Sequence, residues 1–264
     1  SGELKTKPTQ HSVKELRSLG ISPDVLVCRS EQELPKDEKN KIALFCSVPA
    51  KSVISMHDVD TVYSIPILLN KQKVDDTILK KLNLKIKKPN LNDWKRVVKA
   101  KLLPEKEVNV SFVGKYTELK DSYKSINEAL EHAGIQNKAK VNINFVEAEQ
   151  ITSKNVRRVL KKSDAILVPG GFGERGIEGM ILACKYAREN NVPYLGICLG
   201  MQIAIIEYAR NVLKLKSANS TEFDSSTKFP VIGLITEWSD ISGKKEKRTK
   251  NSDLGGTMRL GGQV

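Results

Sequence analysis

A cysteine, Cys198, lies between two glycines in the segment Gly-Ile-Cys-Leu-Gly, residues 196–200. An apolar run precedes this segment and an apolar-periodic segment follows it, so the pattern predicts a strand, a tight turn and a helix. A nucleophile held on such a turn needs small neighbours at Gly196 and Gly200, because larger side chains would clash. The N-terminus of the following helix would lower the pKa of the thiol and stabilise the thiolate. The pattern therefore indicates nucleophilic attack by the sulfur of Cys198.

Backbone N–H groups near Cys198 are expected to stabilise the oxyanion that such an attack creates. The N–H of Leu199 directly follows the cysteine. A second donor is expected at Gly171, in the loop Pro-Gly-Gly-Phe-Gly, one β–α unit earlier and at the same end of the sheet. The alternative for a cysteine between strand and helix is a buried core position, which is what we expect for Cys184.

The same glycine loop also matches a dinucleotide fingerprint. Residues 171–176, GFGERG, fit G-x-G-x-x-G, and Glu189 lies near the expected acidic position. However, the loop follows the third strand of its domain and not the first, and a preceding proline and glycine lengthen it. A dinucleotide-dependent oxidoreductase remains an alternative that titration with NAD would test.

Strands and helices alternate regularly from residue 108 onward, and they are expected to position Cys198 and the glycine loop. The expected strands are 108–114, 140–148, 165–171 and 192–197, and the expected helices are 121–134, 153–164, 176–190 and 201–212. Four β–α steps with short connections predict a doubly wound, mostly parallel sheet. Ligands bind beyond the carboxyl ends of such strands, where both glycine-rich corners fall. The tail 216–264 loses this alternation, and its basic insertion 242–253 is expected to be a mobile loop.

The first 70 residues also alternate between helical and extended patterns. The sequence predicts a helix at 9–20 and strands at 24–30 and 41–48, with a charged loop between the strands. We expect Thr9 to cap the helix and Gly20 to end it. Residues 71–107 are expected to form a linker, in which 91–103 is an amphipathic helix that packs on a flanking domain.

Length and composition limit the classes of protein. A chain of 264 residues has room for one large or two ordinary domains. Its 39% hydrophobic and 28% charged residues are typical of a soluble globular protein, and no apolar run approaches the roughly 20 residues of a membrane helix. The four cysteines show no CxxC spacing, so we expect a reducing, cytoplasmic location and no metal site.

The net charge of +13 raises the possibility of nucleic-acid binding. The lysines are scattered in pairs, however, and the chain has only six Phe, six Tyr and two Trp for base stacking. We therefore expect solvated lysine faces, with a few lysines serving a small phosphorylated ligand, and neither nucleic acid nor membrane as a partner.

Both glycine corners resemble the class I glutamine amidotransferase domain of the CTP synthase family. The resemblance is carried by VPGGFGERGIEG, YLGICLGMQ, NSTEFD and GGTMRLG. An earlier region, from GELKTKPTQHSVKELRSLG to VDTVYSIP, is similar to the C-terminal part of that family's P-loop-type α/β synthase domain. The resemblance implies part of the synthase domain at 1–70, a linker at 71–107, and a flavodoxin-like amidotransferase domain at 108–264 that is truncated at its C-terminus.

The resemblance implies a glutamine-hydrolysing site. Cys198 would attack the amide carbon of glutamine, form a glutamyl thioester and release ammonia. Gln202 and Glu222 match positions that hold the glutamine, with the Glu222 carboxylate on its α-ammonium group. Phe172 and Arg175 lie on the loop associated with GTP, the allosteric activator of the family.

The resemblance also implies the second half of a ligase of pyrimidine biosynthesis. Ammonia would pass to the synthase domain, where UTP, phosphorylated by ATP with Mg²⁺, is aminated to CTP. Lys5, Lys7 and Gln10 match the segment that binds UTP and also CTP as feedback inhibitor, whereas the ATP site would lie largely outside this chain. The family assembles as homotetramers.

Two family features are not found in the sequence. The three histidines are His11, His57 and His132, and none lies in the H-P-E segment that supplies the general base in the family. A P-loop G-x-x-x-x-G-K-[ST] is also not found. We therefore expect a piece of a longer enzyme that by itself neither phosphorylates UTP nor turns over glutamine efficiently. The alternative is a binding-only relative that keeps nucleotide-binding and filament-forming surfaces without catalysis.

Overall fold

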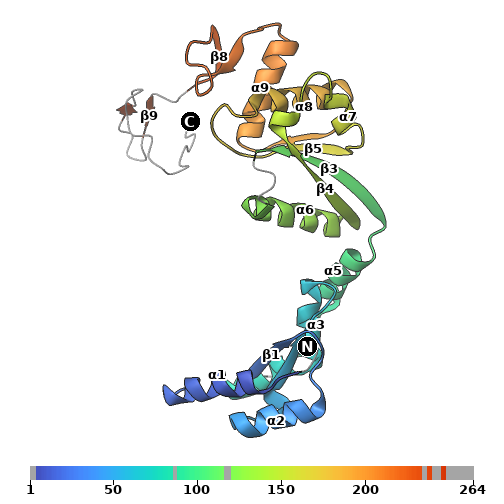
Figure 1. The fold of residues 1–264 in the computed structure, drawn as a ribbon, viewed down its shortest axis with the longest axis vertical. Coiled ribbons are helices and arrows are strands. Elements are labelled where there is room, and N and C mark those ends of the chain that lie inside the picture. The colour runs from blue at the N-terminus through green and yellow to red at the C-terminus, as the bar shows by residue number, and fades with distance from the viewer. Residues whose placement is uncertain (1–3, 86–87, 116–119, 234–236, 240–244, 248–264) are drawn as a thin grey trace. The chain divides into compact units, whose positions relative to one another are not determined.

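The computed structural model describes residues 4–85, 88–115, 120–233, 237–239 and 245–247. The chain divides into two compact units (Figure 1). The first unit comprises Ser1–Glu107 with Leu130–Lys140, and the second comprises Val108–Ala129 with Val141–Val264.

The first unit is built around two parallel strands, β1 (Leu26–Ser30) and β2 (Val53–His57), with Leu26 opposite Val53. Helices α1 (Lys7–Ser18) and α2 (Lys36–Cys46) contribute the buried side chains that pack with these strands. The short helix η1 (Ala50–Ser52) leads into β2. The predicted strand at 24–30 is therefore confirmed.

The prediction of a strand at 41–48 is wrong, because residues 41–46 form the last part of α2, which ends at Cys46. Ile42, Ala43 and Cys46 are buried, which is a helical spacing. Leu44 and Phe45 are exposed and fill the outer face with apolar side chains, so the run reads as continuous and its period is hidden. The charged residues before it, which were expected to form a loop, include the acidic first turn of this helix.

The boundaries of α1 also differ from the prediction at one end. The N-cap position is occupied by Thr6, not by Thr9, and Pro8 lies in the first turn, where a missing backbone N–H costs nothing. The expected stop is confirmed, since Gly20 has a φ of +81° directly after the C-cap Leu19.

The segment expected to be a linker, residues 71–107, contains helices, and further helices lie directly before it. The expected amphipathic helix is confirmed as α5 (Asn92–Leu102), and Trp94 donates its ring N–H to the backbone carbonyl of Tyr63. The additional elements are η2 (Val62–Ser64), α3 (Ile65–Lys71) and α4 (Val74–Lys81).

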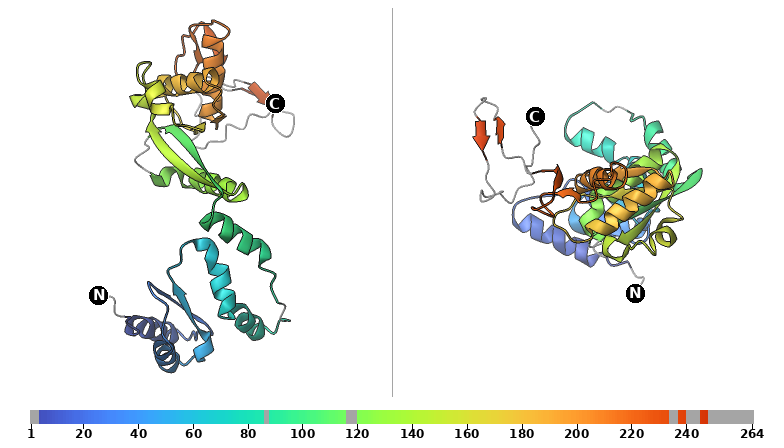
Figure 2. Two further views of the ribbon diagram at one scale, coloured as in Figure 1. Left: turned by 90° about the vertical axis from the view of Figure 1, so that its right-hand side faces the viewer. Right: turned by 90° about the horizontal axis from the view of Figure 1, so that it is seen from above.

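The second unit contains a four-stranded sheet in the order β4-β3-β5-β6. Its strands are β3 (Lys106–Gly114), β4 (Ala139–Glu147), β5 (Ala165–Val168) and β6 (Tyr194–Gly196). β5 pairs in parallel with both β3 and β6, and β4 lies next to β3 at the edge of the sheet. Figure 2 shows the long strands β3, in green, and β4, in yellow-green, side by side. This is the flavodoxin-like strand order, so the predicted doubly wound α/β fold is confirmed.

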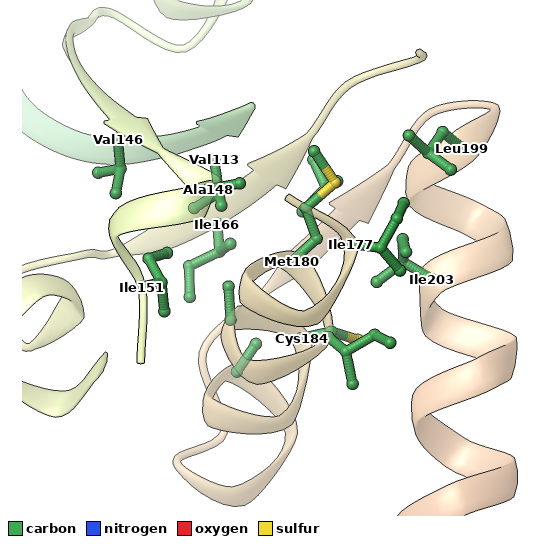
Figure 3. Close-up of a cluster of buried hydrophobic side chains, with 14 of the residues drawn as sticks. Val113, Val146, Ala148, Ile151, Ile166, Ile177, Met180, Cys184, Leu199 and Ile203 are labelled. Atoms are coloured by element: carbon green, nitrogen blue, oxygen red, sulfur yellow. The ribbon is translucent and has the colours of Figure 1, made fainter. Parts of the chain in front are cut away.

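Helices alternate with these strands. In chain order they are η3 (Lys120–Tyr123), α6 (Lys124–Gln136), η4 (Ala148–Gln150), α7 (Val156–Leu160), α8 (Ile177–Glu189) and α9 (Leu199–Asn211). Side chains of the strands, α8 and α9 meet in one buried cluster (Figure 3). Cys184 is buried in it, which confirms its predicted place in the core.

Two small sheets follow α9. β7 (Ala218–Ser220) and β8 (Phe229–Ile232) are parallel, and β9 (Glu237–Ser239) and β10 (Lys245–Lys247) are antiparallel. The basic insertion expected to be a loop thus contains a strand, because Lys245–Lys247 pairs with Glu237–Ser239. The rest of 242–253 lies outside the described residues. In the part of the chain that the structure describes, no helix is long and apolar enough to cross a membrane.

Candidate active site

Cys198 stands at the corner between β6 and α9. Its φ of 53° and ψ of −102° lie in a region that non-glycine residues rarely adopt. The residue is exposed, whereas the next one, Leu199, is buried at the start of α9. The backbone N–H of Ile197 donates to the carbonyl of Val168 over 2.9 Å and ties the turn to β5. The thiol is therefore held on a strained, accessible turn at a helix N-terminus.

The two glycines allow this turn because the backbone packs on itself there. A Cβ at Gly196 would lie 2.4 Å from the carbonyl oxygen of Gly200. A Cβ at Gly200 would lie 2.1 Å from the carbonyl oxygen of Val168. Neither position has space for a side chain, so the predicted need for small residues around the cysteine is confirmed.

Tyr194 stabilises the turn through a hydrogen bond to its backbone. Its hydroxyl donates to the carbonyl of Gly200 over 2.8 Å, which fixes the first turn of α9 against β6. Cys184 lies beside this tyrosine, and burial raises the pKa of its thiol to about 12. Two cysteines of this unit therefore have opposite character, one exposed at the turn and one buried and protonated.

The glycine loop after β5 lies against the cysteine turn. A Cβ built on Gly170 would be 3.4 Å from the Cβ of Cys198 and 4.0 Å from its sulfur. A Cβ built on Gly171 would be 3.3 Å from the Leu199 side chain. The structure thus brings together the two corners that the sequence placed at one end of the sheet, and the assignment of the Gly171 and Leu199 N–H groups as oxyanion donors stays a prediction.

Sequence reasoning missed Lys115, the residue directly after β3. Its Nζ donates to the carbonyls of Phe172 and Gly173, both over 2.7 Å, and the side chain is only 6% exposed. Burial is the main reason that the pKa of this ammonium is lowered. In the sequence, Lys115 is only a lysine that follows an apolar strand. The chain has many other lysines, so this position does not stand out.

Charged residues from other elements hold the rest of the loop. The carboxylate of Glu222 accepts a hydrogen bond from the N–H of Gly173 over 2.9 Å. Arg175 donates to Glu149 over 2.7 Å, and this bond holds the pKa of the Glu149 carboxyl below its usual range. Phe172 is 53% exposed. Four of the predicted site residues, Phe172, Arg175, Glu222 and Cys198, thus lie on or against one short loop.

Gln202 lies on the first turn of α9, four residues after Cys198. Its Oε1 is buried and has no hydrogen-bond partner among the described residues. A buried acceptor without a partner is costly, so this amide is available for a donor group of a ligand.

The predicted UTP residues belong to the first unit. Lys5 lines a pocket together with Thr9, Arg29 and Ser30, among others. Lys7 is exposed and does not line this pocket, and Gln10 donates to the Thr6 hydroxyl over 3.1 Å. The structure therefore brings only one of the three predicted residues to this pocket.

Among the residues that it describes, the structure does not identify a histidine that acts as general base for Cys198. His11, His57 and His132 all fall in the first unit, and Cys198 falls in the second. His132 Nε2 is 2.8 Å from the Tyr63 hydroxyl. Within the described ranges, no group of three or more His, Cys, Asp or Glu side chains could hold a metal ion.

Comparison with known proteins identifies both parts of the chain. The family model "CTP synthase N-terminus" matches residues 1–84, and the family model "Glutamine amidotransferase class-I" matches residues 118–263. A solved structure of the Trypanosoma brucei CTPS glutaminase domain with bound acivicin is 40% identical, with a TM-score of 0.46. That similarity covers 48% of this chain and 50% of the solved one, so the match spans half the length of that protein.

The amidotransferase match alone takes in more than half of the chain and includes the glycine loop, Cys198, Gln202 and Glu222. The CTP synthase match precedes it and includes Lys5, Lys7 and Gln10. The chain therefore belongs to the class-I glutamine amidotransferase family, in the combination of domains that the resemblance to CTP synthases predicted.

Proposed function

We propose that the second unit carries the glutamine-hydrolysing site of a CTP synthase, with Cys198 as its nucleophile. The observation that carries this proposal is the turn itself. A thiol is exposed at a φ of 53°, between glycines that have no space for a Cβ, against a second glycine loop. Strain of this kind is kept where the surrounding structure imposes it, typically at active sites.

The proposed reaction begins when the sulfur of Cys198 attacks the side-chain amide carbon of glutamine. The electron pair of the carbonyl moves to its oxygen, and the N–H groups of Leu199 and Gly171 would stabilise that oxyanion. The carbonyl then re-forms and the carbon–nitrogen bond breaks, the nitrogen takes the proton that the thiol gave up and leaves as ammonia, and a thioester remains. Water hydrolyses the thioester, releasing glutamate and the free thiol.

Two further residues would hold the substrate. Glu222 has one carboxylate oxygen on the Gly173 N–H, which leaves the other oxygen for the α-ammonium group of glutamine. The unpartnered Oε1 of Gln202 would accept a hydrogen bond from the substrate, which the buried position makes favourable. Together Glu222 and Gln202 would select a substrate that has hydrogen-bond donors at both of its ends.

The activity proposed for the whole protein is the amination of UTP to CTP, with ATP and Mg²⁺ as cosubstrates. Lys5 and Arg29 beside one pocket suit a nucleotide phosphate, and Lys7 and Gln10 are proposed for the same ligand and for CTP. The ATP site is proposed to lie largely outside this chain, so we assign no step of ATP chemistry to it. GTP is proposed to act at Phe172 and Arg175, and the protein to work as a cytoplasmic homotetramer.

Covalent labelling tests the nucleophile directly. The chain is incubated with a chloromethyl ketone analogue of L-glutamine, and the modified residue is located by peptide mass spectrometry. We expect one adduct, on Cys198, that forms faster than with the D-enantiomer, is slowed by glutamine and is lost in Cys198→Ala. Labelling at equal rates by both enantiomers, or mainly at Cys184, would contradict the proposal.

A further inference from the structure

The peptide group between Phe172 and Gly173 is held at both of its ends by charged side chains. Its carbonyl, which belongs to Phe172, accepts from Lys115 Nζ over 2.7 Å. Its N–H, which belongs to Gly173, donates to Glu222 Oε1 over 2.9 Å. An ammonium on the oxygen and a carboxylate on the N–H fix the orientation of this peptide plane. Charge-assisted hydrogen bonds of this kind are about twice as strong as neutral ones.

The next peptide is held by the same lysine. Lys115 also donates to the carbonyl of Gly173 over 2.7 Å, so two of its three donors bind successive carbonyls. Gly173 has a φ of +72° and open space around it. A glycine in such surroundings can change its backbone angles at little steric cost, so the loop does not fix its own peptide orientations. The fixed orientation therefore comes from the two charged side chains.

We propose that Lys115 is a positioning residue of the glutamine site. It holds the carbonyls of the glycine loop toward the end of β3 and so sets the direction of the loop's N–H groups beside Cys198. This inference rests on the proposed function, since it concerns the same thiol reaction. The loop begins at Gly170, whose Cβ position lies 3.4 Å from the Cβ of Cys198, so the loop that Lys115 holds is packed against the reacting cysteine.

The burial of Lys115 agrees with this role. Only 6% of the residue is exposed, and a buried ammonium is costly unless it is hydrogen-bonded and paired. Burial lowers the pKa of Lys115, while the charges of Glu222 and Glu149 oppose this shift and Arg175 adds to it. All three of these charged residues lie on or beside the glycine loop. The lysine is thus part of a charge network centred on this loop.

The test compares Lys115→Met with a matched control, Lys162→Met. Methionine keeps most of the buried stem and removes the ammonium, whereas Lys162 is exposed in a turn of the same unit. Inactivation by the chloromethyl ketone of L-glutamine is followed over a range of concentrations, which separates the maximal rate from the binding constant. We expect Lys115→Met to lower the maximal rate about tenfold or more, as for loss of one charged hydrogen bond. The control variant should react like the unmodified chain.

A second reagent separates positioning from a general structural role. Iodoacetamide alkylates an exposed thiol without using the loop, so its rate at Cys198 should stay within about twofold in Lys115→Met. Lys115→Arg keeps the charge and the donors, and it should recover part of the lost rate with the glutamine analogue. If Lys115→Met is unfolded at the assay temperature, Lys115→Gln, which retains one amide donor group, replaces it.

The outcomes are distinct. An unchanged maximal rate in folded Lys115→Met or Lys115→Gln overturns the positioning role and leaves the proposed function in place. Equal losses with iodoacetamide and with the glutamine analogue also overturn it, because they indicate a general disturbance of the turn. If the unmodified chain fails to distinguish the L and D analogues, both the proposed function and this inference are overturned.

Discussion

Cys198 is kept in an unfavourable backbone conformation by bonds on both sides of it. A non-glycine residue with positive φ costs about 1–2 kcal/mol. Against this cost stand the bond from Ile197 to Val168, before the cysteine, and the bond from the Tyr194 hydroxyl to Gly200, after it. These two hydrogen bonds hold the turn on which the thiol is exposed.

The first prediction concerns Gly200, which has the closer backbone contact of the two glycines around Cys198. Gly200→Ala places a Cβ 2.1 Å from the carbonyl oxygen of Val168, and neither backbone segment can move freely. We expect the free energy of unfolding of this unit to fall by about 3 kcal/mol, as for overpacking of a core. Urea unfolding measures it. The control is Gly233→Ala, where nothing lies within 4 Å and the change should stay within about 0.5 kcal/mol. Similar midpoints for both variants would contradict the prediction.

The second prediction concerns the pH dependence that Cys184 confers. Burial raises the pKa of its thiol to about 12 from 9.0, so above pH 9 the unfolded chain loses this proton while the folded chain keeps it. Stability from this group is complete below pH 9 and is lost progressively between pH 9 and 12. Between pH 8 and pH 10 the loss should be about 1.4 kcal/mol.

The measurement is urea unfolding under reducing conditions at pH 8, 9 and 10, for the chain and for Cys184→Ala. The alanine variant is less stable at pH 8 because it loses packing. It has no thiol at this position, so its stability lacks this dependence on pH. The difference in free energy of unfolding between the two proteins should therefore shrink as the pH rises. Parallel profiles for the two proteins would show that the thiol titrates in the same way in both states.

Helices α8 and α9 are joined by a buried ion pair as well as by the apolar cluster. Arg188 at the end of α8 donates to both carboxylate oxygens of Glu207, with the shortest distance 2.7 Å. Glu207 is 1% exposed, and Arg188, whose side chain is 35% exposed, is its ion-pair partner. The hydrogen bond to Glu207 is the main reason that the pKa of Arg188 is raised.

The third prediction follows from this pairing. Arg188→Met leaves the Glu207 carboxylate buried without its partner and should lower the free energy of unfolding by about 3 kcal/mol. The double variant Arg188→Met with Glu207→Leu should recover most of that loss, because no buried charge remains. Chemical denaturation of the unmodified chain, Arg188→Met, Glu207→Leu and the double variant forms a double-mutant cycle. Lys185→Met, which breaks an exposed 4.0 Å pair with Glu189, is the control and should cost less than 1 kcal/mol. A single variant no less stable than the double one would disprove the argument.

The elements of the second unit could be predicted from the sequence because their apolar periods are local. Strands buried on both faces and helices with one buried face give different patterns, and short connections leave few topologies. α2 could not be predicted in the same way, since exposed Leu44 and Phe45 hide its helical period. The contact of Lys115 with the glycine loop joins residues 57 positions apart, and no local pattern reports such a pair.

The two units have separate hydrophobic clusters. One is formed by residues between Leu4 and Val53, and the other by residues between Val113 and Ile232. The two clusters share no side chain. Substitutions in separate clusters with no common partner are expected to act independently.

The fourth prediction uses one fully buried isoleucine from each cluster. Ile203→Ala on α9 and Ile42→Ala on α2 both remove side chains that are at most 1% exposed, so each should destabilise its own unit by about 2–5 kcal/mol. Hydrogen exchange followed by mass spectrometry measures the exchange rates of peptides from each unit separately. We expect faster exchange in the α9 and β5 peptides for Ile203→Ala, and in the β1 and β2 peptides for Ile42→Ala, with the other unit unchanged in each case. Faster exchange throughout the chain from either single substitution would mean that the two units unfold together.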